Sequence, residues 1–205
     1  MRIAVLGAGN VGGALAKGWA KAGHQITLGV RDRSNPDLQA LINSHSGISA
    51  TGVGMAAKSA EVIVVALPAK AVIDVFNSLG DLSDKIIIDA TNSLFSKPGS
   101  YNHASDAIRK INNCSRIVKC FNTTGYENME NPVYQGEPID MFMAGDDREA
   151  KDVCSKLSAD LGFGKCHDFG GFDRIPLLEQ LAMAWINLAV MQKKGRNIAF
   201  KLLER

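Results

Sequence analysis

The sequence predicts an α/β protein with a Rossmann-type, doubly wound and mostly parallel sheet and a short helical C-terminal elaboration. Three observations carry this prediction. A glycine-rich turn at residues 7–12 directly follows an apolar run, short β-rich runs alternate with helical patterns, and from Arg174 onward the pattern is helical only. We interpret residues 1–205 as a single NAD(P)-binding domain, with the nucleotide-binding sheet and helices in 1–171 and the C-terminal helices in 172–205.

The first half of the chain alternates regularly between strands and helices. Short apolar runs predict strands at residues 2–6, 26–30, 48–51, 62–67 and 85–89. Helical patterns separate them at residues 13–22, 36–46, 55–59 and 71–79, and Ser34 or Asn35 is expected to cap the second of these. The uniformly apolar run at 62–67 is typical of a strand buried on both faces.

The second half adds three strands and then turns helical. Strands are expected at 116–121, 141–144 and 165–169, with a helix at 146–161 whose first turn is acidic. Residues 177–191 leave little polar face, so we expect this helix to be buried by the sheet or by a second subunit. Gly195 ends it, and a short last helix is expected over 198–203.

Composition excludes several classes of protein. Of 205 residues, 46% are hydrophobic and 21% charged, and the net charge of +2 gives no reason to expect a nucleic-acid or membrane partner. The four cysteines form no CxxC pair and no signal peptide is visible, so a cytoplasmic protein with reduced thiols is expected. The four histidines are widely scattered, and we expect no metal site.

The glycine turn after the first strand is typical of a pyrophosphate-binding site. Gly7 permits the tight turn, Gly9 lets the backbone approach the diphosphate, and Gly12 lets the helix pack closely on the strand. Asn10 and Val11 complete the turn, where the N-terminus of the helix offers free N–H groups to an anion.

The end of the second strand indicates which dinucleotide binds. An NAD-binding domain usually places a carboxylate there, but here Gly29 and Val30 are followed by Arg31, Asp32 and Arg33. Guanidinium groups pair with a 2′-phosphate, and Arg31 is the better placed of the two arginines. The sequence favours NADP(H) over NAD(H), although Asp32 could instead pair with an arginine or point at a ribose.

Small and polar residues follow the next strands, at the edge where a nucleotide crevice is expected. Side chains of this kind orient a carboxamide or the edge of a planar ring. The residues predicted to line the cofactor site are Ala66, Leu67, Pro68, Val72, Ala90, Thr91 and Asn92, and Asn122 and Thr123 are predicted as the catalytic residues.

The predicted crevice is poor in groups that exchange protons. Lys119, Tyr126 and His103 are the candidate donors, but Lys119 lies inside a predicted strand. A carbonyl substrate needs a proton donor beside the hydride, whereas a flavin-like ring makes a smaller demand because its proton can come from solvent. This shortage favours a ring acceptor.

The chain resembles the NADP-dependent oxidoreductases of the deazaflavin coenzyme F420, a family similar also to the cytoplasmic domain of the six-transmembrane ferric reductases. The resemblance implies NADPH at the glycine turn, Arg31 at the 2′-phosphate, and a deazaflavin or flavin as second substrate near residues 122–125 and the C-terminal helices. The archaeal members carry histidine and proline where Asn122 and Gly125 stand here. The matching segments are residues 7–12 with 14–16, 29–31, 66–68, 89–92, 119–123, 144–147, 178–182 and 195–203.

Three functions remain open at this point. The first is an NADPH-dependent reductase that passes hydride to a small-molecule acceptor of the flavin type, with a homodimer through the C-terminal helices. The second is a reductase of a small C=N or C=O substrate, like pyrroline-carboxylate reductases or hydroxyacid dehydrogenases, for which the C-terminal region is short. The third is a non-catalytic NADP(H)-sensing module, which predicts no pocket at the nicotinamide end.

Overall fold

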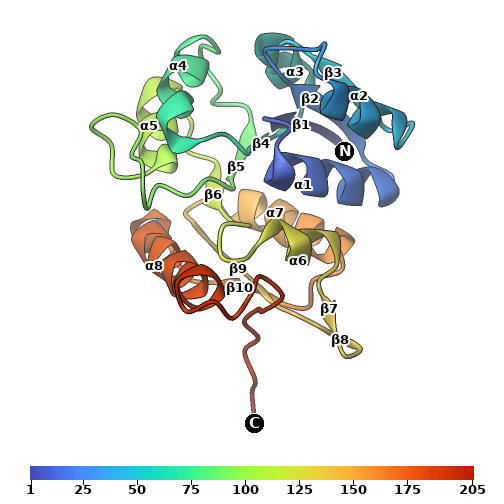
Figure 1. Cartoon of the computed structure of the whole chain (residues 1–205). Coiled ribbons are helices and arrows are strands. Elements are labelled where there is room, and N and C mark those ends of the chain that lie inside the picture. Colours follow the sequence, from blue (N-terminus) through green and yellow to red (C-terminus); the bar gives the residue numbers. More distant parts are fainter.

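The computed structural model describes all residues, 1–205, and confirms the predicted α/β fold with a doubly wound, mostly parallel sheet (Figure 1). Eight strands lie in the order β10-β9-β6-β5-β4-β1-β2-β3, and all neighbours are parallel except β6 and β9. The strands of this sheet are β1 Arg2–Leu6, β2 Gln25–Gly29, β3 Ile48–Thr51, β4 Val62–Val65, β5 Ile86–Asp89, β6 Ile117–Lys119, β9 Met141–Gly145 and β10 Cys166–Asp168.

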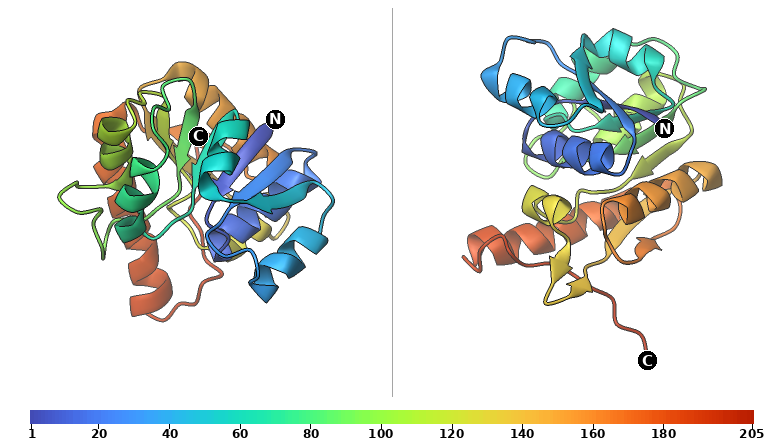
Figure 2. Two further views of the ribbon diagram at one scale, coloured as in Figure 1. Left: turned by 90° about the horizontal axis from the view of Figure 1, so that it is seen from above. Right: turned by 90° about the vertical axis from the view of Figure 1, so that its right-hand side faces the viewer.

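Helices cover both faces of the sheet, as the two additional views show (Figure 2). One layer holds α1 and α7, and the other holds α3, α4 and α5 and is continued by α8 beside β9. The α-helices are α1 Asn10–Lys21, α2 Pro36–Asn43, α3 Val53–Ser59, α4 Val72–Asn77, α5 Ala104–Ile111, α6 Tyr126–Glu130, α7 Arg148–Asp160 and α8 Ile175–Ile186. Short 3₁₀ turns precede α4 and α8, and a π-helical turn, Asn187–Met191, extends α8.

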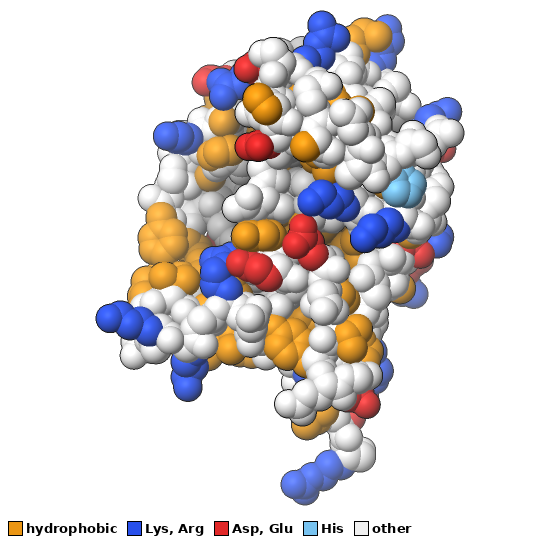
Figure 3. Space-filling model, turned by 45° about the vertical axis from the view of Figure 1, so that its right-hand side comes forward, with side chains coloured by type: hydrophobic (Ala, Val, Ile, Leu, Met, Phe, Trp, Pro, Cys, Tyr) orange, Lys and Arg blue, Asp and Glu red, His pale blue; other side chains and the backbone are white.

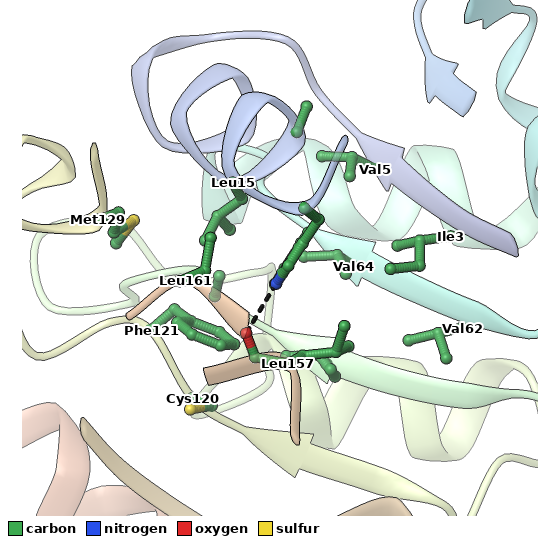
Figure 4. Close-up of a cluster of buried hydrophobic side chains, with 14 of the residues drawn as sticks. Ile3, Val5, Leu15, Val62, Val64, Cys120, Phe121, Met129, Leu157 and Leu161 are labelled. Carbon is green, nitrogen blue, oxygen red and sulfur yellow. Dashed lines mark hydrogen bonds between the residues drawn. The ribbon is translucent and has the colours of Figure 1, made fainter. Parts of the chain in front are cut away.

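The core is divided by the sheet into two main clusters because strand side chains alternate between its faces. Ile3 and Val5 of β1 pack in one cluster, whereas Ala4 and Leu6 pack in the other. On the first face, the Trp19 indole of α1 donates a hydrogen bond to the Leu157 carbonyl of α7 at 2.8 Å, in the packed layer drawn in Figure 4. These contacts fix α1, and with it the glycine turn, on the sheet.

Several local predictions can be compared with the structure directly. Asn35 is confirmed as the cap of α2, since its side chain accepts from the N–H groups of Asp37 and Leu38. The helix predicted over 198–203 is wrong, because that segment is irregular and bonds to other elements: the Ile198 carbonyl accepts from Asn128 and Trp185. Helices α5 and α6 and the small hairpin of β7 Val133–Tyr134 and β8 Glu137–Pro138 were not predicted from the sequence.

The helix predicted to be buried over residues 177–191 is buried on one side only. Leu178, Ala182 and Trp185 lie in the interior, while Leu177 and Val190 are about half exposed, at 52% and 53%. None of the helices combines the length and the apolar character that crossing a membrane would require. The four cysteines are free thiols, and all but Cys166 are fully buried.

Candidate functional site

A crevice of about 1800 Å³ runs along the carboxyl ends of the parallel strands. It extends from the end of β2 past the glycine turn to the loops after β4 and β5, which is where open α/β sheets bind ligands. Charged side chains of both signs gather along the middle of the face shown in space-filling form (Figure 3). Among the predicted site residues, Gly7, Gly9, Asn10, Val11, Val30, Arg31, Ala66, Leu67, Pro68, Ala90, Thr91 and Asn92 line this crevice.

The glycine turn has the geometry that a diphosphate cradle requires. Gly7 has φ +99°, and a Cβ there would lie 2.5 Å from the Ala66 carbonyl oxygen. A Cβ on Gly12 would overlap the Gly7 carbonyl, so this glycine allows α1 to sit against the turn. Gly9 lines the crevice, and a Cβ there would meet no protein atom within 4 Å. The space beside Gly9 is thus left open for another molecule.

The start of α1 is suited to bind an anion. Its first turn carries no acidic residue, and its N-cap, Gly9, has no side chain that could bond the free N–H groups. The first intrahelical bond at this end is from Gly13 N to Gly9 O, so the N–H groups of Asn10, Val11 and Gly12 precede the helical ladder. Unpaired donors and the positive end of the helix dipole together favour a phosphate. The residues present therefore fit a dinucleotide.

The far end of the crevice carries a cation without a partner. Arg31 lines the crevice, and neither Arg31 nor Arg33 forms an ion pair. The Asp32 carboxylate instead accepts from Ser34 N at 2.8 Å and Ser34 Oγ at 2.6 Å, and these hydrogen bonds lower the pKa of Asp32. The carboxylate is thus held by its own turn, and Arg31 stays available for an anionic ligand.

Three predicted cofactor residues lie outside the crevice lining. Gly12 is buried under the turn, where its role is the close packing already described. Val72 is fully buried at the start of α4, in the core behind the Pro68 loop. Arg33 is exposed beyond the crevice, and its carbonyl accepts from Gln39.

Neither of the two predicted catalytic residues lines the crevice. Asn122 and Thr123 are both only 3% exposed. Asn122 and Asn92 pair through their carboxamides at 3.3 Å, and Asn92 also donates to the Asn122 carbonyl at 3.2 Å. Asn92 itself lines the crevice, so Asn122 is connected to the crevice through Asn92. The Asn122 Oδ1 atom is buried without a hydrogen-bond partner.

An unusual backbone conformation places these residues. Phe121 has φ +62°, in the left-handed region that non-glycine residues rarely adopt. Its ring is fully buried and packs edge-on against Trp19, with centroids 5.6 Å apart, which holds the backbone in this conformation. The turn at Phe121 follows β6 and comes directly before Asn122, which bonds to Asn92. No feature of the sequence alone indicates it.

Two of the three candidate proton donors do not reach the crevice. His103 is buried as the N-cap of α5, where its Nδ1 accepts from Asp106 N at 3.2 Å, and burial lowers its pKa. Lys119 is fully buried and bonds to Thr91 O at 2.6 Å. Tyr126 alone lines the crevice.

Other crevice residues were not predicted. Asn35 and Asp37 at the start of α2 lie on the wall near Arg31, and Lys17 and Glu130 line the side toward α6. Glu179 was also missed, although a signal was present: it is the only charged residue in the apolar sequence of α8. The structure brings together no group of three or more His, Cys, Asp or Glu side chains that could hold a metal ion.

Comparison with known proteins connects this geometry to a family. Residues 2–93 match the family model described as NADP oxidoreductase, coenzyme F420-dependent. The F420-dependent NADP reductase of Methanothermobacter thermautotrophicus is 27% identical, over 98% of this chain and 94% of that protein. The enzyme of the same name from Methanothermobacter marburgensis is 26% identical, over 98% of each chain.

Solved structures extend the likeness to the whole fold. A putative F420-dependent NADP reductase from Arthrobacter sp. FB24 superposes with a TM-score of 0.86 at 26% identity, with both chains fully covered. The imine reductase of Streptomyces aurantiacus superposes with a TM-score of 0.68 at 19% identity, over 93% of this chain and 63% of that one, and shows the fold alone. The predicted resemblance to the coenzyme F420-dependent NADP oxidoreductases is therefore confirmed, by the family model over residues 2–93 and by curated relatives over 98% of the chain.

Proposed function

We propose that this protein is an NADP(H)-dependent oxidoreductase that transfers hydride between NADP(H) and a flavin-type acceptor, with coenzyme F420 as the leading candidate. The observation that carries the nucleotide assignment is the open glycine cradle with an unpaired Arg31 at the far end of the same crevice. We take coenzyme F420 as the second substrate from the names of the relatives, which are F420-dependent NADP reductases.

In this proposal the chain's own residues bind and orient the nucleotide. The N–H groups at the start of α1 hold the diphosphate, and Arg31 pairs with the 2′-phosphate. The nicotinamide end then lies along Ala90, Thr91 and Asn92, with Asn92 held in place by Asn122. When bound, NADPH supplies the hydride, and the protein contributes alignment.

The positions of the three predicted proton donors support a ring acceptor. His103 caps a helix and Lys119 is buried among carboxylates, so of these three residues only Tyr126 lines the crevice. A carbonyl or imine substrate would need such a donor close to the hydride, whereas a deazaflavin or flavin can take its proton from water. The sensing-module alternative predicts no pocket at the nicotinamide end, but the crevice continues there to Thr91 and Asn92.

Stopped-flow oxidation of NADPH tests this proposal. Purified protein is mixed anaerobically with NADPH and, in separate runs, with F420, FMN, riboflavin or a small cyclic imine. We expect rapid loss of NADPH absorbance with a ring acceptor and none with the imine. Fast turnover of the imine together with no turnover of any flavin or deazaflavin would contradict the proposal.

The cytoplasmic location predicted from the sequence fits this function and stays part of the proposal. The homodimer predicted through the C-terminal helices likewise stays a prediction, which light scattering of the purified protein would test.

A further inference from the structure

Two carboxylates and one ammonium group are buried together behind the nicotinamide end of the crevice. Lys119 Nζ lies 3.3 Å from Asp89 Oδ2 and 2.9 Å from Glu179 Oε1. The Lys119 and Asp89 side chains are completely buried, and that of Glu179 is 9% exposed. Asp89 and Lys119 are cross-strand partners on β5 and β6, and Glu179 comes from α8.

This cluster carries one more negative charge than positive. Burial raises the pKa of Asp89, but the Lys119 ammonium and the donors of Ser105 and Thr91 more than offset this and lower it. Glu179 accepts from Ser93 N at 3.1 Å as well as from Lys119, which suits a carboxylate. No further cation pairs with either acid. Burying a charge without a partner of opposite sign lowers stability, and such charges are often found at functional sites.

The cluster is bonded directly to the wall of the crevice. Lys119 donates to the Thr91 carbonyl at 2.6 Å, and Thr91 donates to Asp89 through both its N–H, at 2.9 Å, and its hydroxyl, at 2.7 Å. Thr91 lines the crevice, while its neighbour Ser93 is the residue that bonds to Glu179. One residue therefore separates the excess charge from the surface along which the nicotinamide lies in the proposed function.

We propose that the Asp89–Lys119–Glu179 cluster sets a negative potential at the nicotinamide site and thereby favours the oxidised, positively charged ring over the neutral reduced one. The proposal rests on the proposed function, because it needs a nicotinamide nucleotide in the crevice. A fixed charge in a water-poor interior acts on a nearby charge more strongly than it would in water. Glu179 acts through this field as a positioning residue and does not touch the nucleotide.

The negative potential should change the relative affinities for NADP⁺ and NADPH rather than the affinity for both. The nicotinamide ring gains positive charge as hydride leaves NADPH, so the same potential stabilises the ring during hydride transfer. The diphosphate and the 2′-phosphate are identical in the two redox forms. A purely structural defect therefore changes the affinity for both forms together, whereas a change in the field changes their ratio.

The test is the ratio of the dissociation constants for NADP⁺ and NADPH, measured by calorimetry on wild type and on Glu179→Gln. The amide keeps the shape of the side chain and one acceptor oxygen but removes the excess charge. We expect the ratio Kd(NADP⁺)/Kd(NADPH) to rise about three- to tenfold. Asp89→Asn, which removes one negative charge from the other side of Lys119, should shift the ratio in the same direction.

Glu149→Gln is the matched control, because Glu149 is an exposed residue at the start of α7 that pairs with Arg116. It removes the same charge from the molecule and should leave the ratio unchanged. An unchanged ratio in folded Glu179→Gln, or an equal loss of affinity for both forms, overturns the proposal and leaves the proposed function intact. Failure of the wild type to bind either form would instead overturn the proposed function.

Discussion

In the proposed function, Arg31 is the residue on which the choice of nucleotide depends. It lines the crevice without an ion-pair partner, and Asp32, the nearest competitor, is held by Ser34. A charge-assisted hydrogen bond contributes about 1.5–3 kcal/mol, so Arg31→Ala should weaken NADPH binding about ten- to a hundredfold. Affinity for NADH should hardly change, because NADH has no 2′-phosphate.

Arg33→Ala is the control for this prediction, since Arg33 is exposed and does not line the crevice. Calorimetric titration of both variants with NADPH and NADH measures the effect. An equal loss for the two nucleotides in Arg31→Ala would remove the basis for NADP(H) preference.

Gly9 and Gly12 should respond to the same substitution in opposite ways. A Cβ on Gly12 overlaps the Gly7 carbonyl, so Gly12→Ala should lower the free energy of unfolding by about 1–3 kcal/mol, as overpacking does. A Cβ on Gly9 meets no protein atom within 4 Å, so Gly9→Ala should fold normally and lose nucleotide affinity. Urea denaturation and NADPH titration separate the two effects. Normal NADPH affinity in Gly9→Ala would show that no diphosphate lies there.

Of the three predicted proton donors only Tyr126 lines the crevice, and its hydroxyl should matter little if the acceptor is a ring. Tyr126→Phe retains the aromatic surface beside the crevice, so the rate of hydride transfer to a flavin or deazaflavin should stay within about threefold of wild type. Single-turnover stopped flow measures this rate. A loss of a hundredfold or more would indicate that the hydroxyl supplies a proton.

Among single residues, the roles that depend on backbone conformation were the ones that could be predicted from the sequence. Gly7 and Gly12 occupy positions that only glycine fits, so their roles follow from residue type and spacing. The position of Asn122 could not be predicted from the sequence, because it depends on the left-handed turn at Phe121 and on the packing of Phe121 against Trp19. Contacts between residues far apart in the chain leave no pattern in the local sequence.

Among the elements, the C-terminal segment behaves differently from what its composition suggests. Residues 198–203 form no helix and are instead bonded to Asp140, whose carboxylate accepts from Leu202 N at 2.9 Å, Lys165 N at 3.0 Å and His167 Nε2 at 3.1 Å. Burial raises the pKa of Asp140, but these hydrogen bonds more than offset it, and the pKa is lowered.

The Asp140 attachment should therefore depend on pH. A carboxyl group whose pKa is lower in the folded state adds stability above its unfolded value of about 3.9, and this stability is lost as the pH falls through the folded value. At pH 7, Asp140→Asn should melt about 3–8 °C below wild type. The difference should shrink below a pH of about 4.

Scanning calorimetry at several pH values measures this difference. Glu204→Gln is a suitable control, because the exposed Lys165–Glu204 pair in the same segment should contribute little. A difference between Asp140→Asn and wild type that persisted undiminished well below pH 4 would contradict this explanation.

Uniformly apolar strands could be predicted from the sequence, whereas a short element held by distant partners could not. The strand at 62–65 is buried and apolar throughout, and the strand at 2–6 is so from Ile3 to Leu6. The helix α6 has only five residues, and its Asn128 is bonded to the C-terminal segment and to Tyr134. Local propensity carries little information about an element that short.

In the whole molecule, the crevice and the C-terminal helix are connected through the interior. Glu179 of α8 bonds to Lys119 of β6 and to Ser93 beyond β5, so the last helix reaches the end of the crevice where the proposed function places the nicotinamide. The family model covers residues 2–93, whereas the curated relatives cover the chain from end to end. The second substrate is therefore expected where the two regions meet.

Binding of NADPH is the most direct test of this account. Calorimetric titration of the wild-type protein with NADPH, and separately with NADH, should show one site per chain for NADPH and an affinity for NADH weaker by at least tenfold. Absence of measurable heat with both nucleotides across a range of temperatures, confirmed by an unchanged melting temperature, would contradict it.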